Sequence, residues 1–140
     1  MKKKILVLSG DGIGPEIMAE AIKVLKAVER AYGHEFTFIN GLVGGAAWDV
    51  YGEHLPSQTL ALSESCDAIL FGSVGGPVEE QHMGKWKGCE ANALLTLRKH
   101  FGFITNLRPS KVYPSLSKAC VLREDIISGG VDILCVRACG

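Results

Sequence analysis

Apolar and polar positions alternate along the chain in blocks that predict strands and helices in turn. Residues 4–8 form a compact apolar run, which is typical of a buried parallel strand. A glycine-rich turn at residues 10–14 interrupts the run, and Pro15 then stands where the first residue of a helix is expected. Apolar residues recur at helical spacing after Pro15, and Gly33 ends that pattern. The chain therefore begins as strand, turn and helix.

The same alternation continues to the end of the chain. Further strands are predicted at residues 35–40, 67–71 and 131–136, and further helices at 57–65, 90–100 and 123–128. Between the last two helices the chain is extended through Arg108, because Pro109 disfavours a helical conformation at the residue before it. This order predicts an α/β fold with a largely parallel sheet flanked by helices.

Composition narrows the range of partners and compartments. The chain has 140 residues, of which 47% are hydrophobic, so it can bury a core. Its 15 basic and 15 acidic residues cancel, and this balance gives no electrostatic footprint for nucleic acid. No apolar run is long enough to span a membrane. Five cysteines without a C-x-x-C pair indicate neither a disulfide framework nor a zinc site. We expect a cytoplasmic protein without a nucleic-acid or membrane partner.

Two glycine-rich segments follow predicted strands. Residues 10–14 read G-x-G-x-G, which differs from the G-x-G-x-x-G dinucleotide fingerprint, and the second strand ends at Asn40 instead of an acidic residue that could hold a ribose. For this segment a plain turn and a phosphate cradle fit equally well. Residues 72–77 read G-S-V-G-G-P at the carboxyl end of a strand, where open α/β sheets bind ligands. Their glycines allow a ligand to approach the backbone closely.

The helix predicted at residues 90–100 carries charged and aliphatic side chains that suit a small acid. Glu90, Leu94 and Arg98 are spaced four apart, so they share one face of an α-helix, with Leu95 beside them. A second arginine, Arg108, follows in the extended segment, and the planar guanidinium suits bidentate recognition of carboxylate or phosphate. The pattern predicts one wall of a substrate pocket. A solvated amphipathic helix with ordinary surface arginines would produce it as well.

Four motifs together resemble a known family. They are D-G-I-G-P-E at 11–16, G-S-V-G-G-P at 72–77, E-x-x-x-L-L-x-L-R-K at 90–99 and N-L-R-P at 106–109. In combination they resemble the isocitrate/isopropylmalate family of β-decarboxylating dehydrogenases, and most closely its isopropylmalate branch. The resemblance runs from the first strand to Arg137. It implies an incomplete two-domain fold, with the first part of the NAD-binding domain at 1–105 and the start of a second, substrate and dimerisation domain at 106–140.

The resemblance also implies roles for individual residues. Three arginines match the positions that clamp the malate carboxylates: Arg98, Arg108 and Arg137. Three further residues match positions that meet the isopropyl group and the nicotinamide end of NAD: Glu90, Leu94 and Leu95. The implied cofactor-lining set is Ile13, Gly75, Gly76, Pro77 and Glu90.

The implied activity is the NAD-dependent oxidative decarboxylation of 3-isopropylmalate to 4-methyl-2-oxopentanoate, a step of leucine biosynthesis. In the family, NAD removes hydride from the C2 alcohol, Mg²⁺ or Mn²⁺ polarises the resulting ketone, and carbon dioxide leaves. The complete enzyme is expected to be a homodimer that acts on a small 2-hydroxy diacid. Leucines at 94 and 95 favour an isopropyl group, whereas a third carboxylate would need polar partners.

Several family features have no counterpart in this sequence. The family's catalytic lysine and tyrosine and its metal-binding aspartates lie beyond residue 140, so no catalytic residue and no metal ligand is assigned here. After Arg137 the family continues E-L-T-G-G, whereas this chain reads Ala138-Cys139-Gly140. We therefore expect a truncated or frameshifted product that is inactive by itself, with its last strand leaving a parallel sheet edge open.

Two alternatives stay open. The enzyme could act on another 2-hydroxy diacid, such as tartrate or homoisocitrate, which turnover on a panel of acids would reveal. The chain could instead be a flavodoxin-like binding module that needs no catalytic groups. A stable, monodisperse 140-residue protein bound to a partner would favour that second alternative.

Overall fold

The computed structural model describes residues 1–138, and the chain divides into two compact units. The first unit is Met1–His100, and the second begins at Phe101. The boundary predicted from the sequence, after residue 105, lies five residues further along the chain. The roles of the two units as cofactor and substrate domains stay predictions.

A three-stranded parallel sheet forms the centre of the first unit. Its strands are β1 (Lys2–Gly10), β2 (Glu35–Gly41) and β3 (Ala68–Ser73). They lie in the order β2-β1-β3, and both pairings of β1 are parallel. The predicted strands and the parallel sheet are therefore confirmed for this unit.

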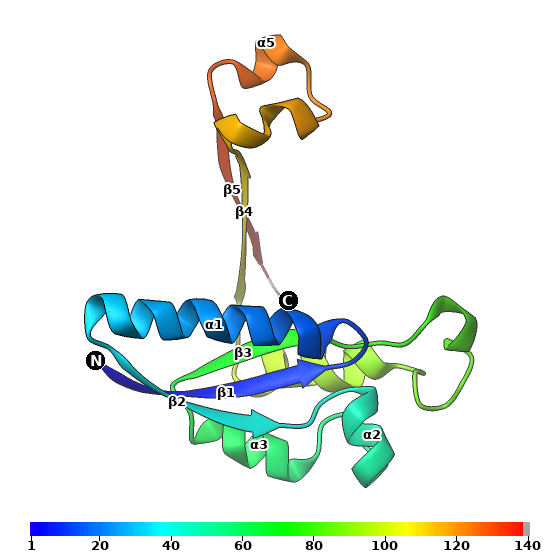
Figure 1. Cartoon of the computed structure of the whole chain (residues 1–140). Coiled ribbons are helices and arrows are strands. Elements are labelled where there is room, and N and C mark those ends of the chain that lie inside the picture. Colours follow the sequence, from blue (N-terminus) through cyan, green and yellow to red (C-terminus); the bar gives the residue numbers. More distant parts are fainter. Residues whose placement is uncertain (139–140) are drawn as a thin grey trace. The chain divides into compact units, whose positions relative to one another are not determined.

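The core of the first unit is built around β1. Leu6, Val7 and Leu8 have exposed fractions of 0, 1 and 0%. Helix α1 (Gly14–Tyr32) covers one face of the sheet and α3 (Ser57–Glu64) lies on the other (Figure 1). A strand covered on both faces needs apolar side chains on both, and burying each leucine or valine contributes about 1.5–3 kcal/mol. This explains why a short uninterrupted apolar run marked the strand.

Helix α1 begins and ends at the residues that the sequence indicated. Pro15 lies in its first turn, where a missing amide N–H costs nothing. Gly33 follows the last turn with φ 65°, and its amide donates to the carbonyl of Glu29. A side chain in that left-handed conformation would cost about 1–2 kcal/mol, so glycine is the residue that suits it. No helix in the described part of the chain, α1 included, is long and apolar enough to cross a membrane.

Two features of the first unit differ from the prediction. Helix α2 (Gly45–Tyr51) was not predicted, because glycines at its start obscure the helical pattern. The helix predicted at 90–100 is present, but it contains a π-helical turn, η2 (Ala91–Leu95), before α4 (Thr96–His100). A short 3₁₀-helix, η1 (Val78–Glu80), lies in the loop that precedes it.

The second unit is built on a two-stranded antiparallel sheet. Strand β4 (Thr105–Val112) pairs with β5 (Val131–Ala138). A 3₁₀-helix, η3 (Pro114–Ala119), and a short helix, α5 (Glu124–Ile127), lie between them. The expected open parallel edge at the last strand was wrong, since β5 pairs antiparallel with β4. A short apolar run predicts a strand but carries no information on the direction of its neighbour.

Candidate functional site

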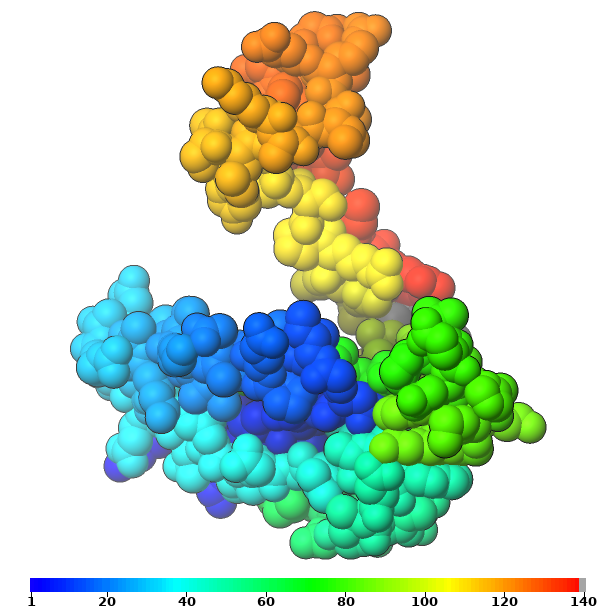
Figure 2. Space-filling model, turned by 45° about the vertical axis from the view of Figure 1, so that its right-hand side comes forward, coloured from blue at the N-terminus to red at the C-terminus, as the bar shows by residue number. Residues whose placement is uncertain are grey.

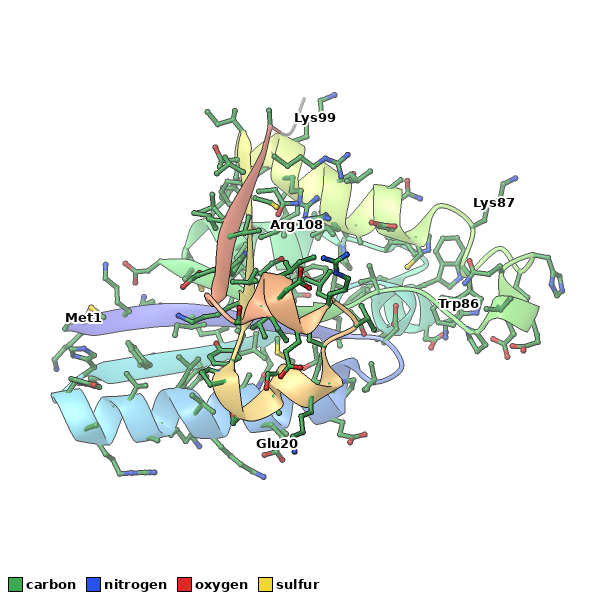
Figure 3. All side chains as sticks on the ribbon, turned by 90° about the horizontal axis from the view of Figure 1, so that it is seen from above. Met1, Glu20, Trp86, Lys87, Lys99 and Arg108 are labelled. Carbon is green, nitrogen blue, oxygen red and sulfur yellow. The ribbon has the colours of Figure 1, made fainter. Side chains whose placement is uncertain are left out.

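An open cavity of about 840 Å³ lies in the first unit, at the carboxyl ends of β1 and β3. Its walls come from the turn after β1, the glycine-rich loop after β3, the loop 78–89, and η2 with the residue that precedes it. In the space-filling view the loop 78–89, drawn in green, lies beside the dark-blue start of α1 (Figure 2). On the loop, Trp86 lines the cavity, whereas Lys87 extends away from it (Figure 3). Parallel α/β sheets bind ligands at this edge.

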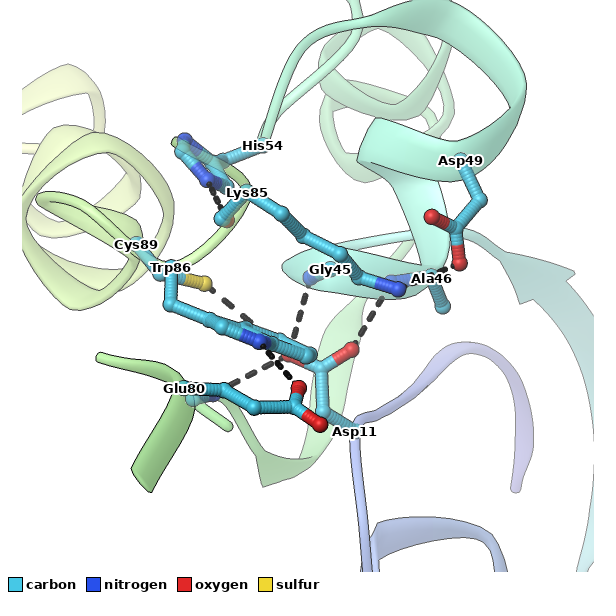
Figure 4. Close-up of polar contacts among 10 residues, drawn as sticks. Asp11, Gly45, Ala46, Asp49, His54, Glu80, Lys85, Trp86 and Cys89 are labelled. Atoms are coloured by element: carbon cyan, nitrogen blue, oxygen red, sulfur yellow. Dashed lines mark hydrogen bonds and ion pairs between the residues drawn. The ribbon is translucent and has the colours of Figure 1, made fainter. Parts of the chain in front are cut away.

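The carboxylate of Asp11 holds three segments together at the base of the cavity. Asp11 is only 6% exposed. Its Oδ2 accepts hydrogen bonds from the amides of Gly45 at 2.8 Å and Gly75 at 3.0 Å, and its Oδ1 accepts one from Ala46 at 2.8 Å (Figure 4). Gly45 and Ala46 begin α2, where unpaired amides and the helix dipole favour a carboxylate. Asp11 therefore joins the end of β1 to α2 and to the glycine-rich loop.

Glycine is required where these segments approach one another. Gly44 has φ 73°, and a Cβ there would lie 2.3 Å from Oδ2 of Asp11. A Cβ at Gly10 would lie 1.8 Å from the carbonyl oxygen of Ser73. Any larger residue at either position would push the buried carboxylate or the strand ends apart. The first glycine of the G-x-G-x-G turn thus serves the packing of β1 against β3, while Gly12 lines the cavity.

Cys89 is a buried residue of the cavity lining, and its side chain is directed at Asp11. It is 3% exposed, and its Sγ is 3.9 Å from Oδ2 of Asp11. Burial raises the pKa of the Cys89 thiol above its ordinary value, and the negative charge of Asp11 raises it further. A thiol with a raised pKa is a poor nucleophile at neutral pH. We therefore assign Cys89 to the packing of the site and not to its chemistry.

His54 braces the loop that forms one wall of the cavity. It is 3% exposed, its Nε2–H donates to the carbonyl of Lys85 at 2.7 Å, and its Nδ1 accepts from the side-chain amide of Asn92 at 3.2 Å. A neutral imidazole satisfies both bonds at once. His54 is therefore a structural histidine that joins the loop to the π-helical turn.

All five residues predicted to line a cofactor site border this one cavity. They are Ile13, Gly75, Gly76, Pro77 and Glu90. Ile13 is 60% exposed and Glu90 is also exposed, so both side chains are available to a ligand. Three separate segments of the sequence supply these residues, and the fold brings them to one place.

The π-helical turn determines which leucine reaches the cavity. Leu95 lines it, whereas Leu94 and Arg98 are half-buried and lie outside its lining. The amide of Thr96 donates to the carbonyl of Ala91, five residues back, as expected for a π-helix. The wider turn aligns residues five apart, so Leu95 shares a wall with Glu90. The predicted four-residue spacing of Glu90, Leu94 and Arg98 therefore does not describe the cavity wall.

Two of the three predicted substrate arginines share one face of the second unit's sheet. Asn106 pairs with Arg137, and Arg108 pairs with Cys135. Paired residues of an antiparallel sheet lie on the same face, and positions two apart on one strand do too, so Arg108 and Arg137 are diagonal neighbours about 7–8 Å apart. Both are exposed. Among residues 1–138, the guanidinium groups of Arg108 and Arg137 form no ion pair within the second unit. The guanidinium group of Arg98, in α4, forms none with the described residues of the first unit.

The described residues do not make a divalent-metal site by themselves. Within residues 1–138 no group of three or more histidine, cysteine, aspartate or glutamate side chains is placed to hold a metal ion. Of the two acids that line the cavity, Asp11 already has both oxygens bonded to backbone amides. Glu90 alone cannot supply the several oxygen ligands that Mg²⁺ or Mn²⁺ requires.

Sequence reasoning missed three residues that shape the site: Asp11, His54 and Trp86. The D-G turn at Asp11 is typical of a carboxylate that bonds its own nearby backbone, whereas the partners of Asp11 are 34 to 64 residues away in the sequence. His54 and Trp86 lie in segments without hydrophobic periodicity, and their partners are distant in sequence.

Over nearly its whole length the chain is similar to isocitrate and isopropylmalate dehydrogenases. The family model described as isocitrate/isopropylmalate dehydrogenase matches residues 4–139. The 3-isopropylmalate dehydrogenase of Desulfotalea psychrophila is 56% identical over 135 residues, which cover 96% of this chain and 38% of the relative. That of Escherichia coli strain K12 is 52% identical over 133 residues, which cover 95% of this chain and 36% of the relative. The chain thus spans somewhat more than a third of the length of these relatives.

Solved structures of three other proteins share the fold of this chain. A β-decarboxylating dehydrogenase from Thermococcus kodakarensis superposes with a TM-score of 0.64 at 28% identity, covering 98% of this chain and 34% of that chain. A protein from Thermus thermophilus superposes with a TM-score of 0.73 at 26% identity, and the match covers 98% of this chain and 24% of that protein. An isocitrate dehydrogenase from Methylococcus capsulatus superposes with a TM-score of 0.67 at 25% identity, and the match covers 96% of this chain and 34% of that enzyme. The chain therefore has part of a larger α/β fold.

Proposed function

Because the chain belongs to the isocitrate/isopropylmalate dehydrogenase family, we propose that it forms the N-terminal, ligand-binding part of a 3-isopropylmalate dehydrogenase. The proposed reaction is the NAD-dependent oxidative decarboxylation of 3-isopropylmalate to 4-methyl-2-oxopentanoate, in leucine biosynthesis. The complete enzyme is proposed to act as a homodimer with Mg²⁺ or Mn²⁺. No residue within 1–138 is assigned to the metal, and no step is derived through it.

The observation that carries this proposal is the convergence of five predicted cofactor residues on one cavity. The lining of that cavity contains two acids and no lysine or arginine, and the first acid, Asp11, is buried and bonded to amides. Glu90 is therefore the charge that meets a ligand. A carboxylate accepts hydrogen bonds from ribose hydroxyls and attracts the cationic ring of oxidised nicotinamide, whereas it would repel a phosphate. These features support the proposal that the cavity holds the nicotinamide riboside end of NAD.

Each unit, taken by itself, offers one feature that suits the proposed substrate: guanidinium groups in the second unit and hydrocarbon in the first. Arg108 and Arg137 present two planar forks from one face of the β4–β5 sheet, an arrangement suited to carboxylate. In the first unit Leu95, 48% exposed, gives the cavity an aliphatic wall. An isopropyl group gains from such a wall, whereas the extra carboxylate of isocitrate would lose its hydration there. We propose 3-isopropylmalate as substrate for this reason.

In this proposal the chain binds and orients the reactants. NAD, when bound, supplies the hydride acceptor for the C2 alcohol. Glu90 and the glycine-rich loop would hold the nicotinamide riboside, and the arginines would hold the carboxylates. Correct placement of two reactants is itself a large part of a rate enhancement.

The proposal is tested in a chimera in which residues 1–138 replace the matching segment of the Desulfotalea psychrophila relative. We expect the chimera to reduce NAD with 3-isopropylmalate, and to use isocitrate, tartrate and homoisocitrate at least about tenfold less efficiently. The 140-residue chain alone and the native relative serve as controls. Faster turnover of tartrate or homoisocitrate would replace the proposed substrate, and a folded but inactive chimera would contradict the proposal as a whole.

A further inference from the structure

The indole ring of Trp86 lies against the backbone of two separate segments. A Cβ built on Gly76, in the glycine-rich loop, would come within 2.2 Å of the ring, and so would a Cβ built on Gly45, at the start of α2. No side chain fits between the ring and either glycine. Trp86 is half-buried in this position and also lines the cavity. The ring therefore contacts two of the segments that Asp11 ties together, the start of α2 and the glycine-rich loop.

Polar groups also contact the indole ring. Its Nε1–H donates to Oε2 of Glu80 in η1 at 3.0 Å. The ammonium group of Lys85 lies 4.7 Å from the ring centroid, as in a cation–π contact, and its Nζ is 2.5 Å from Oδ2 of Asp49 in α2 (Figure 4). The His54 imidazole holds the carbonyl of Lys85, one residue before the tryptophan. The ring and its backbone are thus anchored to η1, α2 and the segment between α2 and α3.

We infer that Trp86 is a positioning residue of the cavity, which sets the place of Gly76 and keeps the Gly75 amide on the carboxylate of Asp11. Gly75 and Gly76 line the cavity, and glycine lets a ligand approach the backbone closely. If the ring is lost, the loop 78–89 keeps only its polar contacts, and the glycine-rich loop gains room to move away from Asp11. The consequence for cofactor affinity rests on the proposed function, whereas the consequence for the glycine-rich loop does not.

The test begins with ligand-free protein and compares the variants Trp86→Leu, Trp86→Phe and Lys87→Ala. Lys87 is the matched control, because it is exposed on the same loop and points away. Amide hydrogen exchange reports local opening, and we expect Trp86→Leu to speed exchange of the Gly75 amide at least about tenfold while amides of β1 keep their rates. Trp86→Phe retains a flat ring and should restore most of the protection. Lys87→Ala should exchange like wild type.

Two results would overturn the inference. Unchanged exchange at Gly75 in Trp86→Leu would show that the ring does not hold the loop. Equal acceleration throughout β1 would show that the ring supports the whole unit and has no specific effect on the cavity.

Titration of the same variants with NADH tests the link to the cofactor. We expect Trp86→Leu to weaken NADH binding by at least about tenfold and Lys87→Ala to leave it within about twofold. Wild-type affinity in a Trp86→Leu variant with a loosened Gly75 amide would refute that link. If the wild-type chain binds no NADH, the proposed function fails for this chain, and the exchange experiment still decides whether Trp86 positions the loop.

Discussion

Asp11 is a single side chain on which the geometry of the cavity depends, because three backbone amides from two segments meet its carboxylate. The substitution Asp11→Asn keeps the size of the side chain. It replaces one acceptor oxygen of the carboxylate with an NH₂ group, a donor that would face a backbone N–H. We expect a loss of about 1.5–3 kcal/mol in the free energy of unfolding, measured by chemical denaturation. Glu20→Gln removes a charge from an exposed side chain of α1 and is the matched control. Equal stability of the two variants would refute the role given to Asp11.

Cys89 should be the slowest of the described cysteines to react with iodoacetamide. Its thiol is buried and its pKa is raised, whereas Cys135 is exposed. Because the folded pKa is raised, the protonated thiol contributes stability that is fully present below the unfolded pKa of about 8.5 and is lost as the pH rises through the folded value. Peptide mapping across a pH series measures the rates at which iodoacetamide modifies Cys89 and Cys135. Modification of Cys89 as fast as Cys135 in folded protein would contradict this assignment.

Single residues differ in how far the sequence reveals them. Gly76 and Glu90 were predicted from motifs, and both border the cavity. Trp86 was not predicted, because its partners Gly45 and Gly76 give no local pattern and meet it only in the folded unit. Motifs identified residues that line the cavity, whereas the side chains that support them depend on tertiary packing.

Helices and strands whose formation depends on residues close in the sequence were predicted well. β1 follows from its apolar run, and α1 follows from its proline start and glycine end. Helix α2 was missed because its first amides depend on Asp11, 34 residues earlier in the chain. The π-helical turn η2 was missed because its sequence also fits a regular α-helix.

The π-helical turn predicts that the two adjacent leucines differ in function. In the chimera, Leu95→Ser removes the apolar wall and should lower kcat/KM for 3-isopropylmalate by about 10- to 200-fold. Leu94→Ser is the matched control, because Leu94 is half-buried outside the cavity lining and should affect stability more than kcat/KM. Steady-state kinetics with a thermal melt of each variant separate the two effects. A larger kinetic loss for Leu94→Ser would show that the cavity wall has been assigned wrongly.

At the scale of the whole molecule the sequence predicted the fold class but not the arrangement of the second unit. The α/β class followed from alternating elements, and the parallel sheet of the first unit confirmed it. The antiparallel pairing of β4 with β5 was not predicted, since pairing direction depends on the connection and not on the strand itself. That pairing is also what places Arg108 and Arg137 on one face.

The shared face predicts that Arg108 and Arg137 act as carboxylate clamps. In the chimera, replacing either with lysine should lower kcat/KM by about ten- to a hundredfold, because lysine cannot form two parallel hydrogen bonds. Lys111→Arg is the control, since Lys111 lies on the opposite face and pairs with Asp132. Wild-type kinetics in both lysine variants would leave the arginines as ordinary surface cations.

The most direct measurement is a titration of the 140-residue chain with NAD, followed through its backbone amide resonances. The cavity account predicts saturable shifts at residues 12–13, 74–77 and 88–91, which lie around the cavity in three separate segments. The lysine-lined hollow at the opposite ends of the strands, around Lys2 and Asp67, should not respond. Shifts confined to that hollow, or no saturable shift at all, would contradict the assignment of the cavity to the cofactor.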